Sequence, residues 1–138
     1  MEGEDVRIVR DVFDGVAAWD VDGVLGLLAP DVVWEPRAFL TGEGEFHGHD
    51  GVRRWMDQMR ELAAAGTQVV TVADEYRVLG DGRILVLGEG EIRRPAGDLG
   101  QKLGWLWTLA DGRVTEMHNY LTHGEALRAA GLEEAPES

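Results

Sequence analysis

The sequence predicts an α+β fold in which three N-terminal helices pack on a curved antiparallel sheet. Apolar residues recur at helical spacing in the first half of the chain, and strand-like segments follow one another from residue 67 to residue 122. Short turns containing Gly and Asp separate these segments. Helices followed by a run of strands are typical of the α+β class, because neither layer can bury its apolar side alone.

The first half is expected to contain two helices at 5–19 and 21–28, a short strand at 32–34 and a loop at 41–50. A third helix is expected at 50–66. Asp20 and Asp50 are expected to cap the second and third helices, since a carboxylate accepts the free N–H groups of a first turn. The apolar side of the first helix is formed by Val6, Val9, Val12, Phe13, Val16 and Ala17.

The second half is expected to form a meander of four strands at 67–79, 83–94, 99–110 and 113–122. The pairs Asp81-Gly82 and Asp111-Gly112 are typical of tight hairpins, whose central residues need positive φ. A short helix at 125–130 and a frayed tail at 133–138 complete the expected order, so residues 1–138 are expected to form one domain.

Composition excludes several function classes. The chain has 26 acidic and 13 basic side chains, and its formal net charge of −13 disfavours nucleic acid and anionic membrane surfaces as partners. The absence of cysteine excludes disulfides, thiol nucleophiles and thiolate metal sites. No apolar run resembles a signal peptide or a membrane span, so a cytoplasmic protein is expected.

Several segments, taken in order, resemble the nuclear transport factor 2-like superfamily and, within it, the SnoaL-like polyketide cyclase group. They are 18–23 (AWDVDG), 27–34 (LLAPDVVW), 46–52 (FHGHDGV), 111–114 (DGRV) and 120–132. The resemblance covers nearly the whole chain and implies a cystatin-like cone around one apolar pocket. It also implies that the protein needs no cofactor and forms a homodimer. It does not specify a reaction, because this fold hosts isomerases, dehydratases, cyclases, epoxide hydrolases and binding domains.

The resemblance also implies which residues line the pocket. Alignment with ketosteroid isomerases places alternate strand residues inside, namely Leu103, Trp105, Trp107, Met117 and Asn119, with Leu85, Leu87, Glu89 and Glu91 on the neighbouring strand. The helices would close the pocket with Val12, Phe13, Val16, Trp55, Met56 and Met59. A slip of one residue would turn any of these sets outward.

The catalytic pattern of those isomerases is absent. Its tyrosine, aspartate base and protonated acid fall on Val12, Pro36 and Trp105, so that chemistry is not expected here. The SnoaL-like and epoxide hydrolase groups use carboxylates from later strands; Glu89 or Glu91 matches this in part, whereas the carboxylate of the final strand is replaced by Asn119.

The candidate catalytic residues are Glu89, Glu91, Asn119 and His47. An inward Glu89 beside tryptophans would lose hydration, which would raise its pKa and suit it to proton transfer; an outward Glu89 would be a solvated charge. Asn119 would hold a carbonyl or a water, or serve as a structural amide. His47 is expected at the pocket rim, and no metal site is expected, because His47 and His49 lack further ligands in a Gly-rich loop.

Three functions are therefore open. The first is a SnoaL-like enzyme performing cofactor-free acid–base chemistry on an apolar cyclic substrate, with Glu89 as the acid–base group. The second is a protein of the same fold that binds a hydrophobic small molecule without catalysis. The third is a self-association module. A homodimer is expected through an outer sheet face that carries Ile84, Val86 and Leu106.

Overall fold

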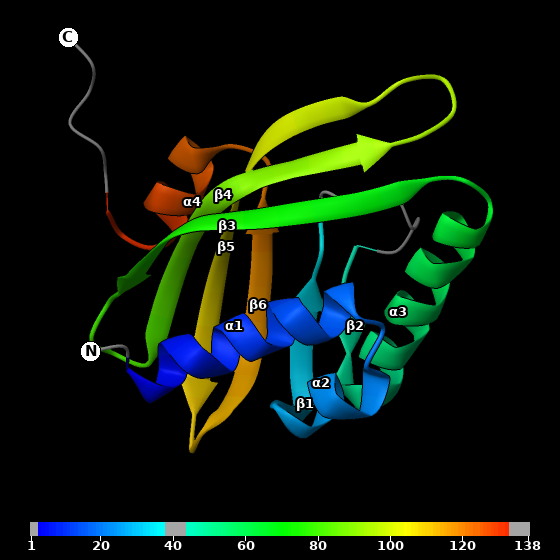
Figure 1. The fold of residues 1–138 in the computed structure, drawn as a ribbon. Helices are drawn as coiled ribbons and strands as arrows, with labels where there is room; N and C mark the ends of the chain where they lie inside the picture. The colour runs from blue at the N-terminus through cyan, green and yellow to red at the C-terminus, as the bar shows by residue number, and fades with distance from the viewer. Residues whose placement is uncertain (1–2, 38–43, 133–138) are drawn as a thin grey trace, which may run out of the picture.

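The computed structural model describes residues 3–37 and 44–132. The expected tail at 133–138 and the start of the expected loop at 41–50 lie outside these residues. Figure 1 shows a strongly curved sheet that α1 crosses on one face, with α3 at one end of the sheet and α4 on the opposite face. The α+β fold class predicted from the sequence is confirmed.

The elements follow the expected order, with one additional strand. They are α1 (Glu4–Ala17), α2 (Val21–Gly26), β1 (Leu28–Glu35), β2 (Phe46–His47), α3 (Gly48–Ala64), β3 (Gln68–Val78), β4 (Arg83–Arg93), β5 (Leu99–Ala110), β6 (Arg113–Tyr120) and α4 (His123–Ala129). The six strands are ordered β2-β1-β6-β5-β4-β3. Each neighbouring pair is antiparallel except β1 and β6, which run parallel. The sheet is therefore mixed rather than wholly antiparallel.

Two helix starts illustrate how local sequence sets the fold. The Asp20 side chain accepts a hydrogen bond from the Gly23 N–H at 3.1 Å, which confirms its role as the cap of α2. The prediction that Asp50 caps α3 is wrong, because α3 begins at Gly48. Phe46 is fully buried and holds the chain in β2 against β1, and the positive φ of Gly48, +70°, then permits an immediate turn into the helix.

The sheet is buried on parts of both faces. The face covered by α1, α2 and α3, here called the inner face, holds the main core, which includes Trp34, Trp55, Trp105, Trp107 and Met117. A smaller cluster lies on the outer face beneath α4 and contains Leu85, Leu87, Leu106, Ala126, Leu127 and Ala130. Full burial of one such large side chain contributes about 1.5–3 kcal/mol, so the contacts of α4 stabilise the outer face.

The pairing of β4 with β5 decides which side chains face inward. Val86 lies opposite Trp105 and Ile84 lies opposite Trp107, so Ile84 and Val86 belong to the inner core. The prediction that Leu85, Leu87, Glu89 and Glu91 face the interior is therefore wrong, as is the placement of Ile84 and Val86 on the outer face. Leu106 does lie on the outer face, but α4 covers it.

Candidate functional site: an aromatic cavity between α1, α3 and β3

A cavity of about 470 Å³ lies between α1, the second half of α3 and the edge strand β3. Its wall contains four aromatic side chains, from Phe13, Trp19, Trp55 and Tyr76, together with the apolar side chains of Val16, Ala17, Met59, Ala63, Val69, Val70 and Ala73. A volume of this size is within the range of small-molecule pockets, roughly 300–1,000 Å³. This site is called the α1–β3 cavity below.

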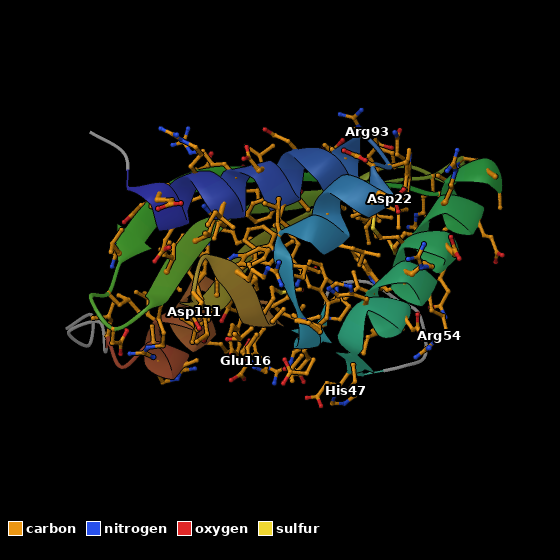
Figure 2. All side chains as sticks on the ribbon, turned by 90° about the horizontal axis from the view of Figure 1, so that it is seen from below. Asp22, His47, Arg54, Arg93, Asp111 and Glu116 are labelled. Carbon is orange, nitrogen blue, oxygen red and sulfur yellow. The ribbon has the colours of Figure 1, made fainter. Side chains whose placement is uncertain are left out.

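The aromatic wall rests on a second layer of buried rings. The Phe13 ring meets the rings of Trp105 and Trp107 edge-on, with centroids 5.1 Å and 5.3 Å away. The Trp55 ring lies 5.3 Å from Trp34 between centroids, and Trp34 in turn lies 5.8 Å from Trp107. Figure 2 shows side chains filling the space between α1 and the strands. Because packed rings of this kind have few alternative rotamers, the cavity wall is stiff.

The charged side chains of the cavity lie on its solvent side. Arg10, Asp14 and Asp74 line it, and all three are exposed residues. The guanidinium carbon of Arg10 lies 4.8 Å from the centroid of the Tyr76 ring. Apart from these groups and the Tyr76 hydroxyl, the described residues that line the cavity include no titratable side chain. Gln68 and Thr71 add neutral polar side chains, and the rest of the wall is apolar and aromatic.

The sequence-based lining set divides into three groups. Phe13, Val16, Trp55 and Met59 line the cavity as expected. Met56, Trp105, Trp107 and Met117 are at most 2% exposed and belong to the core behind the wall. Leu87 packs beneath α4 on the outer face, so its placement in the pocket is wrong.

Sequence reasoning missed Arg10, Asp14, Trp19 and Asp74. The first two follow from helical spacing, since Arg10, Phe13 and Asp14 lie within one turn of each other on α1. Strand alternation gives no signal for Asp74, because this residue occupies a β-bulge. Ala73 pairs with Gly88 and Glu75 pairs with Leu87, so Asp74 has no pairing residue on β4.

Glu89 and Glu91 lie on the outer face, in a shallow hollow of about 330 Å³ that also involves Val70, Val72 and Lys102. The Glu89 side chain is 58% exposed and lies 3.9 Å from Lys102 Nζ. The Glu91 carboxylate accepts a hydrogen bond from Arg93 Nε at 2.5 Å, and this bond raises the pKa of Arg93. Neither carboxylate has the apolar surroundings that acid–base catalysis by Glu89 required.

Asn119 points inward and is fully buried, as expected. Its Nδ2 donates to the backbone carbonyl of Gly104 at 2.9 Å, on the neighbouring strand. Asn119 does not belong to the cavity wall. Its geometry therefore matches the structural alternative, in which the amide satisfies backbone groups inside the sheet.

His47 lies away from the cavity, so its expected position at the pocket rim is wrong. Its side chain is 66% exposed, and Nε2 lies 2.9 Å from Oε1 of Glu45. Figure 2 shows His47 on the side of the molecule opposite α1. The ring of His49 instead bonds the Leu28 carbonyl at 3.0 Å. Within residues 3–37 and 44–132, no group of three or more His, Asp or Glu side chains is placed to hold a metal ion.

A second polar cluster lies on the outer face at the β1–β6 junction. His118 Nδ1 lies 2.8 Å from Glu35 Oε1, and His118 Nε2 lies 2.9 Å from Glu116 Oε1. Partial burial opposes protonation of His118, but the hydrogen bonds to Glu116 and Glu35 outweigh it and raise the His118 pKa. Beside them, Arg37 lies over the Tyr120 ring, and burial raises the Tyr120 pKa.

A curved, unclosed sheet whose inner face is covered by helices defines the α+β class of nuclear transport factor 2-like and cystatin-like folds. An NTF2-like protein of unknown function from Burkholderia pseudomallei is similar over 97% of this chain and 100% of its own, with 27% identity and a TM-score of 0.73. A protein from Xanthomonas campestris with a cystatin-like fold has 18% identity, covers 94% of this chain and 98% of its own, and has a TM-score of 0.70.

The chain belongs to the SnoaL-like domain family, whose pattern matches residues 9–117. A Sinorhizobium meliloti protein described as a candidate polyketide cyclase is 25% identical over 83% of this chain and 94% of its own, with a TM-score of 0.64. No curated protein matches the sequence. Among the described residues, no helix is both long and apolar enough to span a bilayer.

Proposed function

We propose that this SnoaL-like protein binds an apolar, ring-containing small molecule in the α1–β3 cavity. The observation that carries the proposal is the wall itself, in which Phe13, Trp55 and Tyr76 surround a space of about 470 Å³. Flat aromatic side chains on a stiff base favour a flat apolar ligand, because stacking and the release of water from both surfaces stabilise the complex. A molecule of about two to four fused rings suits such a volume.

A second candidate is cyclase-type acid–base chemistry on the same bound molecule. The observation that favours it is the presence of two carboxylates, Asp14 and Asp74, on the open side of the cavity. Either could accept a proton from a ring substituent that reaches the solvent side. Support also comes from the similarity to the Sinorhizobium meliloti protein, which is described as a candidate polyketide cyclase.

Binding can be tested by filling the cavity with a larger side chain on α1. Val16 lines the cavity, so a Val16→Trp variant should occupy it with an indole and weaken binding of neutral fused-ring alcohols by at least about tenfold. Asp11→Trp is the matched control, because Asp11 lies on the exposed side of the same helix and does not line the cavity. Calorimetric titration measures both. Equal affinity of wild type and a folded Val16→Trp protein would contradict the proposal.

Catalysis is distinguished from binding by the carboxylates. If the second candidate holds, Asp14→Asn or Asp74→Asn abolishes turnover of a bound substrate, whereas neutral alcohols still bind. If the protein only binds its ligand, wild type and both variants convert no substrate. The substitutions then change only the affinity for charged ligands.

A further inference from the structure

We infer that the ligand of the α1–β3 cavity carries a positively charged amino group, which Asp14 and Asp74 hold on the open side of the cavity. This inference rests on the proposed function and adds the charge of the ligand to it. The apolar part of such a molecule would lie against the aromatic wall, and its ammonium group would reach the two carboxylates.

The carboxylates of Asp14 and Asp74 are free to contact a ligand. Within the described residues, neither side chain takes part in an ion pair or a hydrogen bond. The other carboxylates of β3, β4 and β6 each have a cationic partner: Arg77 for Glu75, Lys102 for Glu89, Arg93 for Glu91 and His118 for Glu116. Among the described carboxylates of these three strands, Asp74 is thus the one without a cationic partner, and it lines the cavity.

Arg10 offsets only part of this charge. It is the one cation among the described residues that line the cavity, and its guanidinium lies over the Tyr76 ring. Two aspartates against one arginine leave the lining with an excess negative charge, and the whole chain carries −13. A field of this sign attracts a cationic ligand and repels an anionic one.

An irregularity of β3 brings Asp74 to the cavity. In a regular strand, Ala73 and Asp74 would face opposite sides of the sheet. The bulge between Ala73 and Glu75 breaks this alternation, and Ala73, Asp74 and Tyr76 all line the cavity. Bulges commonly redirect one side chain next to a functional site.

Aromatic rings complete a site suited to an organic ammonium group. Trp19 lines the cavity and takes a φ of +58°, which is unusual for a bulky residue. Together with Phe13, Trp55 and Tyr76 it lines the same cavity as the two carboxylates, and aromatic ring faces attract organic cations. A bare metal ion fits less well, because the described residues contain no group of three or more ligating side chains.

The experiment compares three probes that share one ring system and differ only in charge: aminotetralin as its ammonium, neutral tetralol, and tetralin carboxylate. Aminotetralin should bind about three- to tenfold more tightly than tetralol, since exposed ion pairs contribute modestly, and the carboxylate should bind most weakly. The preference for the ammonium should decrease as salt is raised, because the carboxylates are exposed.

Variants assign the preference to the two residues. Asp14→Asn and Asp74→Asn should each reduce the preference for aminotetralin over tetralol, and the double variant should abolish this preference. Asp11→Asn, on the same helix but outside the cavity, should retain the full preference. Equal binding of aminotetralin and tetralol to wild type, or a preference that survives in the double variant, would overturn the inference and leave the proposed function standing. Binding that is insensitive to Val16→Trp would overturn both.

Discussion

His118 on β6 and Glu35 on β1, which are 83 residues apart in the chain, join the two strands through a contact of 2.8 Å between Nδ1 and Oε1. The other ring nitrogen lies 2.9 Å from Glu116 Oε1. Because a carboxylate only accepts hydrogen bonds, both contacts are satisfied together when the ring is protonated. Figure 2 shows Glu116 on the face opposite α1, where this cluster lies.

His118 should make stability depend on pH. Its folded pKa is raised, so its stabilising contribution is fully present below the unfolded pKa of about 6.5 and is lost as pH rises through the folded pKa. His118→Gln should therefore destabilise the protein by about 1 kcal/mol at low pH and less at high pH. Urea unfolding of both proteins from about pH 5 to about pH 9 tests this; a difference that is constant over the range would contradict it.

Glu89→Gln should change the free energy of unfolding by less than about 0.5 kcal/mol near neutral pH, because this side chain is 58% exposed. Glu35→Gln serves as the comparison, since Glu35 is only 18% exposed and bonds His118. It should cost about 1 kcal/mol. Thermal melts of the two variants measure the contrast. Clear stabilisation by Glu89→Gln would instead indicate a buried carboxylate.

Gly104→Ala should loosen α4 from the outer face. A Cβ at Gly104 would lie 2.4 Å from the Cβ of Ala126, and neither atom can rotate away. We expect a loss of about 1–3 kcal/mol, typical of overpacking. Gly100→Ala on the same strand is the control, because a Cβ there meets nothing within 4 Å. Urea unfolding compares them, and equal stability of the two variants would count against the packing described for α4.

Substitutions at Trp19 should show that the backbone conformation at the end of α1 is energetically unfavourable. It follows the C-cap Ala18 and has a φ of +58°, in the left-handed region where a Cβ is unfavourable. Both Trp19→Ala and Trp19→Gly remove the indole, but only glycine relieves the backbone. Trp19→Gly should therefore be more stable than Trp19→Ala by roughly 1–2 kcal/mol in urea unfolding. An alanine variant as stable as the glycine variant would show that the conformation relaxes.

Much of the fold could be predicted from local patterns. Helical spacing located α1 and α3, and the Asp111-Gly112 turn has positive φ at both residues, 53° and 77°, as its hairpin requires. The alignment with ketosteroid isomerases correctly placed Leu103, Trp105 and Trp107 on the inner face. In α1 and α3 only one face is buried, so the apolar residues identify that face correctly.

The orientation of β4 was decided by the tertiary structure. Residues 84–87 are apolar at both parities, because α1, α2 and α3 cover the inner face while α4 covers the outer one. Alternation cannot choose between two buried faces, and only the pairing of Val86 with Trp105 sends Glu89 outward. The cavity likewise depends on the bulge at Asp74 and on the left-handed backbone of Trp19. Neither could be predicted, because a side chain that an irregular backbone redirects does not follow the periodic pattern of its helix or strand.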